Sequence, residues 1–187
     1  MGQEHPEISE KLADFIRAQH LFFVATAPAG PGGHVNVSPK GRDTLVILGA
    51  RRVAYLDLTG SGIETIAHLR ENGRITFMFC SFEGKSKIVR LHGRGTAHPI
   101  GSAAFDDLAA HFPEMPGRRA VIDVEIDRVS TSCGFGVPRM QLVAERDEIA
   151  QWVERKGGEP AMEGYRHRKN ATSIDGLAGW SSPPAGS

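Results

Sequence analysis

The chain is poor in cysteine and in net charge, and each shortage excludes a class of protein. It has 2 cysteines in 187 residues, too few for a disulfide framework or a cysteine-built metal cluster. The 8 histidines include no pair at the H-x-x-x-H spacing, so we expect no metal site. Lys and Arg number 22, as do Asp and Glu, which leaves no overall field to attract nucleic acid or an acidic membrane surface.

Long apolar runs are also missing. No segment is long enough to cross a membrane, and the polar N-terminus lacks the apolar centre of a signal peptide. We therefore expect a cytoplasmic protein with reduced thiols. Its 40% hydrophobic and 24% charged residues are typical of a globular protein, and its length favours one domain, or one domain with a small appendage.

Hydrophobic patterning predicts a chain built mainly of strands joined by hairpins. Roughly seven segments alternate or run apolar over the length of a strand. We expect strands at 21–26, 34–38, 44–48, 53–58, 74–82, 87–98 and 120–131. Helical periodicity predicts helices at 6–19, 63–71, 101–111, 145–156 and 160–169. This pattern favours an antiparallel sheet closed or nearly closed into a barrel, with helices at its ends.

The most informative segment is a glycine-rich turn, residues 59–62 (TGSG), between the strand at 53–58 and the helix at 63–71. A loop of small residues that leads into a helix binds anions, because its backbone N–H groups are unpaired and the helix dipole is positive there. We therefore expect a phosphate-binding loop. A structural reading is compatible with it: Ser61 caps the helix and Glu64, three residues on, closes a capping box.

The same turn also resembles part of a dinucleotide-binding fingerprint, Gly-x-Gly-x-x-Gly. Glu83 lies about 20 residues further on, where a ribose-binding acid would stand. However, Thr65 occupies the position of the third glycine, and this crossover is isolated in a chain rich in hairpins. A Rossmann oxidoreductase is therefore the less favoured alternative.

A second polar segment is residues 36–41 (NVSPKG). We expect Pro39 to end the strand, so that Ser38 and Lys40 present a hydroxyl and an ammonium group at its tip. Such groups suit a phosphate or the polar edge of a ring. The alternative is a solvated strand end.

Three cationic side chains alternate along the strand at 87–98. Arg90, His92 and Arg94 fall on one face, and the glycines between them allow another backbone to approach closely. The face is either part of a binding site or an exposed wall of the barrel.

The two thiols differ in their surroundings. Cys80 lies in an apolar strand pattern and is expected to be buried. Cys133 begins a tight apolar loop, residues 133–138 (CGFGVP), and could act as a nucleophile. No nearby His or Asp orients a base for it, so a structural role is favoured. The basic run at 166–169 (RHRK) is expected to be a solvated helix end.

Taken together, several segments resemble the pyridoxamine 5'-phosphate oxidase-related, FMN-binding split-barrel superfamily. The segments that carry the resemblance are residues 35–41, 55–62, 64–69, 72–75, 90–95 and 132–138. Their order and spacing are more specific than any one of them alone. The resemblance spans about residues 21–138 and is strongest to a bacterial branch of uncharacterised members, which also shares features of the tail at 169–177.

This resemblance implies a mainly β protein with flanking helices, an α+β fold built on a six-stranded antiparallel split β-barrel. It implies FMN as the cofactor, with a deazaflavin or haem as alternatives. It also implies a homodimer with FMN at the subunit interface. We expect a split-barrel domain at 1–140, including the N-terminal helix, and a C-terminal helical extension at 141–187 packed on the same domain.

The resemblance further implies which residues bind FMN. Some lie on the strand at 36–41 and line the ring and the phosphate; others come from the glycine-rich turn and helix, and one arginine is a further phosphate candidate. The residues are Asn36, Val37, Ser38, Lys40, Leu58, Thr59, Ser61, Thr65 and Arg90.

The function that this resemblance favours is an FMN-dependent oxidoreductase acting on a small organic substrate. The carboxy-terminal Trp and Arg-Leu-His-Asp type signature of the vitamin-processing oxidases is not found, so no substrate is carried over. No residue stands out as a proton donor. The alternative is a flavin-, deazaflavin- or haem-binding protein with a sensing, storage or carrier role and no turnover.

Overall fold

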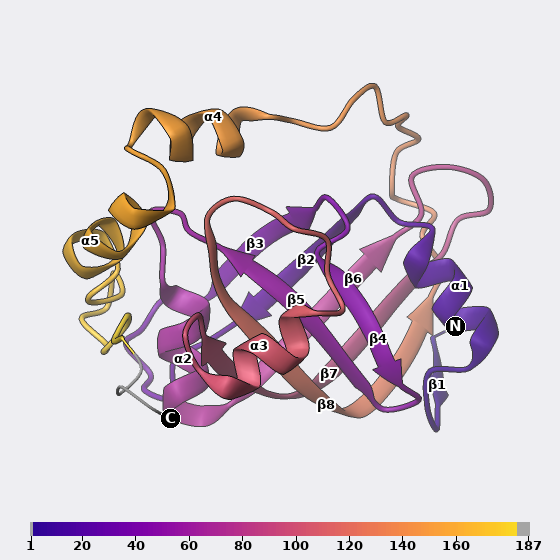
Figure 1. Cartoon of the computed structure of the whole chain (residues 1–187). Coiled ribbons are helices and arrows are strands. Elements are labelled where there is room, and N and C mark those ends of the chain that lie inside the picture. The colour runs from indigo at the N-terminus through magenta and orange to yellow at the C-terminus, as the bar shows by residue number, and fades with distance from the viewer. Residues whose placement is uncertain (1, 183–187) are drawn as a thin grey trace.

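One antiparallel sheet curls into a split barrel in this computed structural model, which describes residues 2–182 (Figure 1). The strands are β1 (Gln3–His5), β2 (Leu21–Thr26), β3 (Asn36–Gly41), β4 (Leu45–Gly49), β5 (Arg52–Leu58), β6 (Arg74–Cys80), β7 (Ile88–Pro99) and β8 (Arg118–Ser132). Their order is β3-β2-β6-β7-β8-β5-β4, and β1 pairs with β8. The strands β3 and β4 follow each other in the chain, yet they end this path on opposite sides of the split.

Five helices flank the sheet: α1 (Glu10–Arg17), α2 (Glu64–Asn72), α3 (Ala103–Ala109), α4 (Glu148–Arg155) and α5 (Glu159–Lys169). Apolar residues of α1 and α2 join the core inside the barrel. Residues of α3 cover the outer side of β5 and β8, where Ala54, Leu56 and Val121 lie against Phe105 and Leu108. Because β5 is covered on both faces, its burial is nearly continuous rather than alternating.

The centre of the barrel is an aromatic cluster. Phe22, Tyr55, Phe77 and Phe79 lie with ring centroids 5.7–6.4 Å apart, and three of the five contacts are edge-to-face or tilted. Such pairs add about 0.5–1.5 kcal/mol each beyond their buried area. The cluster joins β2, β5 and β6 inside the barrel.

The expected fold class is confirmed, and the strand count is corrected. The sheet has eight strands, whereas the resemblance implied six and the patterning about seven. The strand that the patterning missed is β1, which is three residues long and pairs with β8. The first helix spans Glu10–Arg17 rather than 6–19. Pro39 does not end its strand: β3 continues to Gly41 because it is an edge strand, where a missing N–H leaves no neighbour unpaired.

The predicted capping box at α2 is wrong. The residue before the helix is Ile63, and it makes no side-chain capping bond. The Glu64 carboxylate instead accepts a hydrogen bond from the backbone N–H of Ile174, 3.3 Å away. A partner from the distant C-terminal segment has therefore replaced the local cap.

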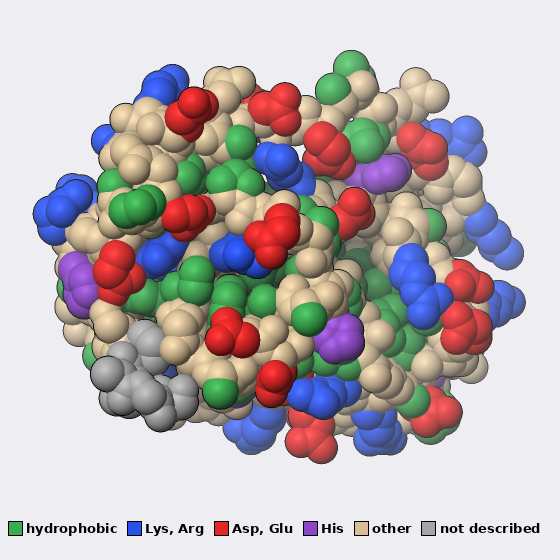
Figure 2. Space-filling view, viewed as in Figure 1, with side chains coloured by type: hydrophobic (Ala, Val, Ile, Leu, Met, Phe, Trp, Pro, Cys, Tyr) green, Lys and Arg blue, Asp and Glu red, His purple; other side chains and the backbone are tan. Residues whose placement is uncertain are grey.

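The surface charge is mixed, and the described residues include neither a membrane-spanning helix nor a metal-binding cluster. Side chains of both charge signs are interspersed over the face drawn in Figure 2, with no large patch of one sign. None of the helices in residues 2–182 is long and apolar enough to span a membrane. In the same residues, no group of three or more His, Cys, Asp or Glu side chains is placed to hold a metal ion. The division of the chain at residue 140 stays a prediction.

A glycine on β7 is required by close strand packing. A Cβ atom on Gly93 would collide with the backbone carbonyl of Glu125, at the point where the pairing of β7 and β8 shifts register. We expect Gly93→Ala to lower the free energy of unfolding by about 1–3 kcal/mol, measured by urea denaturation. The matched control is Gly49→Ala, which meets no atom within 4 Å and should change stability by less than about 0.5 kcal/mol. Equal effects of the two substitutions would contradict this account.

Candidate functional site

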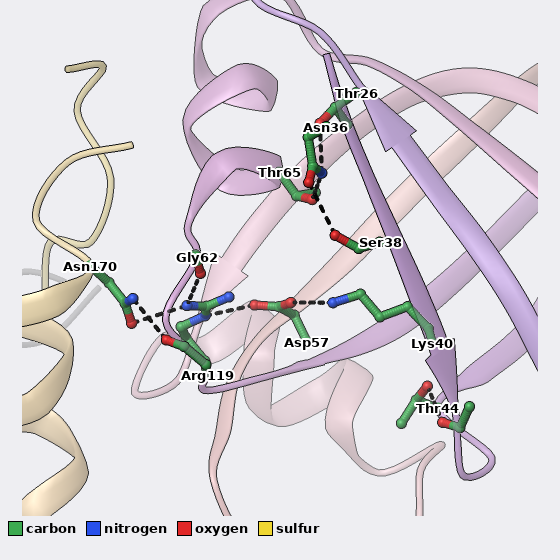
Figure 3. Close-up of polar contacts among 12 residues, drawn as sticks. Thr26, Asn36, Ser38, Lys40, Thr44, Asp57, Gly62, Thr65, Arg119 and Asn170 are labelled. Atoms are coloured by element: carbon green, nitrogen blue, oxygen red, sulfur yellow. Dashed lines mark hydrogen bonds and ion pairs between the residues drawn. The ribbon is translucent and has the colours of Figure 1, made fainter. Parts of the chain in front are cut away.

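The glycine-rich loop at 59–63 is held from one side by buried side chains (Figure 3). Asn170 Nδ2 donates to the carbonyl oxygens of Gly60 (2.9 Å) and Ser61 (3.2 Å). Arg119 donates to the carbonyl of Gly62 at 2.8 Å. Among the described residues, the N–H groups of positions 61–63 donate to no protein atom. The loop therefore has satisfied acceptors on one side and free donors, as anion binding requires.

A buried ion-pair network lies beside this loop. Arg119 Nε donates to Asp57 Oδ2 at 2.7 Å, and Lys40 Nζ lies 3.4 Å from Asp57 Oδ1. The Asp57 side chain is 1% exposed, Arg119 is 5% exposed and Lys40 is 23% exposed. One carboxylate thus faces two cations, which leaves one positive charge unbalanced, and Lys40 is the cation that reaches solvent.

The ionisation of Asp57 depends on those two cations. Burial alone disfavours the charged form and raises the pKa, but the charges and hydrogen bonds of Arg119 and Lys40 outweigh it and hold the pKa of Asp57 below its ordinary value. Asp57 is therefore ionised in the folded protein at neutral pH, and Lys40 stays fixed over the barrel.

A cluster of neutral polar groups lies between β3 and the first turn of α2 (Figure 3). Asn36 Nδ2 donates to Thr65 Oγ1 at 3.1 Å and, more weakly, to Thr26 Oγ1 at 3.4 Å. Ser38 Oγ donates to Asn36 Oδ1 at 3.1 Å. The Thr26 hydroxyl also bonds His68 Nδ1 at 3.0 Å. These bonds fix the orientation of the Asn36 amide.

Two buried polar atoms near this cluster have no partner within residues 2–182. His68 is fully buried, and its Nε2 atom makes no hydrogen bond there; the same is true of the Tyr55 hydroxyl. Burial and the neighbouring Asp57 carboxylate raise the pKa of Tyr55, so the hydroxyl stays protonated. Unsatisfied buried polar atoms are rare in folded proteins and concentrate where a ligand or a functional group is accommodated.

A cavity of about 310 Å³ opens next to Lys40. Leu58 of β5 lines it, and Arg146 and Ile149 close it from the C-terminal segment. Its volume lies at the lower end of the range of about 300–1,000 Å³ found for ligand pockets. Lys40 and Leu58, two of the residues predicted to bind a cofactor, thus face one cavity.

The structure brings some of the predicted site residues together and separates others. Asn36, Ser38, Lys40 and Thr65 lie on one side of β3, facing the loop. Val37 points to the opposite side and is 60% exposed, as strand alternation requires.

The two loop residues differ in accessibility. Ser61 is exposed on the loop, but Thr59 is buried, and its hydroxyl accepts a hydrogen bond from Arg166 Nε at 3.0 Å. Thr59 is therefore committed to the C-terminal helix.

Arg90 does not join the cluster within one chain. It pairs across the sheet with Met78, which pairs with Phe23, which in turn pairs with Pro39. Side chains in one such row share a face of the sheet, and the residue after Pro39 points the other way. Arg90 therefore lies on the outer face, opposite Lys40, and donates to Ser132 Oγ at 3.1 Å.

Sequence reasoning missed three residues that organise the site: Asp57, Arg119 and Asn170. Asp57 had a usable signal, because it is the one carboxylate in the apolar run 53–58 and must be paired if that strand is buried. Arg119 and Asn170 had none, since they contact the loop from 57 and 110 positions away.

Comparison with known proteins identifies the fold and the family. The family model for pyridoxamine 5'-phosphate oxidase matches residues 8–133. The chain belongs to the pyridoxamine 5'-phosphate oxidase family. It is 37% identical over 191 residues to the pyridoxamine 5'-phosphate oxidase family protein ustO of Aspergillus flavus. The alignment covers 94% of this chain and 76% of ustO. Since this relative is fungal, the predicted placement in a bacterial branch is not supported.

Two solved structures resemble the barrel. HupZ of Group A Streptococcus superposes with a TM-score of 0.51 at 24% identity and covers 65% of this chain and 91% of its own. A putative pyridoxamine 5'-phosphate oxidase of Lactobacillus delbrueckii gives a TM-score of 0.52 at 19% identity, covering 67% and 94%. At such identities the likeness establishes the split-barrel fold alone.

The buried Asp57 predicts a strong and pH-dependent effect on stability. We expect Asp57→Asn to lower the free energy of unfolding at pH 7 by about 3–5 kcal/mol, because Arg119 is left buried without a counter-charge. The folded pKa of Asp57 is lowered, so its contribution is complete above the unfolded pKa of about 4 and is lost as pH falls through the folded value. The substitution should therefore cost less in acid than at pH 7.

Asp123→Asn is the matched control in the same sheet. Asp123 pairs with Arg52 at 2.8 Å, and Arg52 is 54% exposed, so its loss should cost about 0.2–1 kcal/mol. Urea unfolding between pH 3 and pH 7 measures both variants. A pH-independent cost at Asp57 would contradict the ion-pair account.

Proposed function

We propose that this protein is an FMN-binding oxidoreductase that moves hydride or electrons between the flavin and a small organic substrate. Two observations carry the proposal in a chain of the pyridoxamine 5'-phosphate oxidase family. The loop N–H groups at 61–63 have no protein partner among the described residues, and Asp57 and Arg119 link the loop to the unbalanced charge of Lys40. We place the activity in the cytoplasm, where the free thiols of Cys80 and Cys133 would stay reduced.

The residues present fit a phosphate-bearing flavin. The N–H groups of positions 61–63 and the first turn of α2 suit the phosphate, and Lys40, linked to the loop through Asp57 and Arg119, supplies a cation. The free edge of β3 presents backbone groups that suit the polar edge of the ring. The Tyr55 ring lies beneath Lys40, with Nζ 5.8 Å from the ring centroid. When bound, the flavin supplies the redox chemistry; the protein's own groups bind it, orient it and exclude water.

We further propose a homodimer with the flavin between subunits. Val35 and Val37 are 70% and 60% exposed at the edge strand, on the same outer face as Arg90. Exposed apolar residues of this kind suit a protein interface. A second copy seated there would cover these exposed apolar side chains.

One observation favours the alternative, a binding protein that senses, stores or carries its ligand without turnover. In the described residues, the titratable groups beside the loop are committed to one another: Lys40 and Arg119 both pair with Asp57. These three groups are therefore held as ion-pair partners rather than left free to transfer a proton. The two functions separate by steady-state reduction of the bound flavin with NADPH, which the carrier would not support.

Flavin binding is tested with the purified protein and two ligands. We expect FMN to bind more tightly than riboflavin, which lacks the phosphate, and Lys40→Ala to weaken FMN about 10- to 100-fold, the loss of one charge-assisted hydrogen bond. Flavin fluorescence titration measures both affinities, and sedimentation equilibrium reports the oligomer. Lys169→Ala is the control, since that exposed lysine forms no ion pair in the described residues.

Two outcomes would contradict the proposal. Equal affinities for FMN and riboflavin would remove the phosphate site, and an unchanged FMN affinity in Lys40→Ala would remove Lys40 from it. Mass spectrometry of the small molecule released on denaturation would reveal a deazaflavin or haem in place of FMN.

Substituting Glu64 should change the affinity for FMN in the opposite direction to Lys40→Ala. Its carboxylate folds back against Gly62 at the start of α2, where the helix dipole favours negative charge. A phosphate bound at the loop would meet this like charge. We therefore expect Glu64→Gln to tighten FMN binding by about two- to tenfold, while riboflavin binding stays the same. Weaker FMN binding in this variant would place the phosphate elsewhere. Glu71→Gln, at the far end of the same helix, is the control.

A further inference from the structure

The C-terminal segment after α5 is bound tightly to the glycine-rich loop. Asn170 follows α5 directly and is fully buried. Its side chain donates to two successive loop carbonyls, at Gly60 and Ser61, and accepts from Arg119 at 3.0 Å. Every hydrogen-bonding group of this side chain therefore faces the loop or the residue that completes its support.

We propose that Asn170 is a positioning residue, which turns the N–H groups of the loop outward for a phosphate-bearing ligand. The inference rests on the proposed function, because it assigns Asn170 a part in the same site. It goes beyond that function by making the C-terminal segment a component of ligand binding rather than a cover for the barrel.

The geometry of the peptide bond carries the argument. In a planar trans peptide the C=O and the following N–H point in opposite directions. Asn170 and Arg119 hold the carbonyls of Gly60, Ser61 and Gly62 on one side of the loop. The N–H groups of the next residue in each case, positions 61–63, must therefore point away from that side. Three successive donors that share a direction form an anion-binding concavity.

Asn170 is itself fixed by backbone bonds. Its N–H donates to the carbonyl of Arg166 at 2.8 Å, and its own carbonyl accepts from the N–H of Trp180 at 2.5 Å. A Cβ atom on Gly179 would collide with that carbonyl, so the chain passes close by. The amide is thus held before any ligand arrives, and little conformational entropy remains to be lost on binding.

Arg119 completes the support and links it to Lys40. The guanidinium is fixed by Asp57, which also holds the ammonium of Lys40. The support of the loop and the position of Lys40 are therefore set by one connected network. A phosphate bound at the loop gains from the loop donors, and a ligand without a phosphate does not.

The test compares two flavins on two proteins. We expect Asn170→Ala to weaken FMN binding about tenfold, while riboflavin binding changes less than about twofold, both measured by flavin fluorescence. A merely structural role would weaken the two ligands alike. Thr172→Ala is the control, because this exposed side chain makes no hydrogen bond in the described residues and should leave both affinities unchanged.

The other outcomes would contradict either the role of Asn170 or the proposed function. A parallel loss for FMN and riboflavin, or no loss for either, would overturn the role of Asn170 but not the phosphate site. A wild-type protein that binds FMN no better than riboflavin would overturn the proposed function and this inference with it. If Asn170→Ala does not fold, Asn170→Ser, which keeps a smaller polar side chain, is measured in the same way with the same expected selectivity loss.

Discussion

The burial of Asp57 is the constraint on which the rest of the site depends. A carboxylate that is 1% exposed must be compensated, and Arg119 of β8 and Lys40 of β3 do so. The pair with Arg119 joins neighbouring strands. The pair with Lys40 reaches across the split of the barrel, since β3 is at the far end of the sheet from β5. One charge therefore ties the free edge strand to the covered half of the sheet.

The same charge explains why this region suits an anion. Two cations compensate one carboxylate, so the network is positive where Lys40 meets solvent. The loop that Arg119 supports has its carbonyls from Gly60 to Gly62 bound, and the N–H groups of the residues after them donate to no atom of the described part of the chain. Neither feature alone defines a site, because helix N-termini and lysines are common. Both features depend on Arg119, which donates to the Gly62 carbonyl and pairs with Asp57, the partner of Lys40. They therefore belong to one connected network.

The sequence predicted what short-range patterns determine. Strand β2 was predicted with its observed ends, because a short run of apolar residues bounded by polar ones is typical of a buried strand. The strand expected at 34–38 is observed as β3, Asn36–Gly41, and the predicted turn at 59–62 does separate β5 from α2. Contacts between distant residues decided the rest: Ile174 displaced the local cap at Glu64, and the edge position of β3 allowed Pro39 inside the strand. Local secondary-structure propensity does not predict such contacts between distant residues.

The C-terminal segment limits how far family membership determines function. The family match ends at residue 133, whereas Asn170 and Arg166, which hold the loop, lie beyond it. HupZ covers 65% of this chain, but the fungal relative covers 94%. If the direction of the loop donors depends on Asn170, the barrel supplies a common frame and the tail sets how that frame holds a ligand. Two barrels of the same fold would then differ in ligand without any change in the strands.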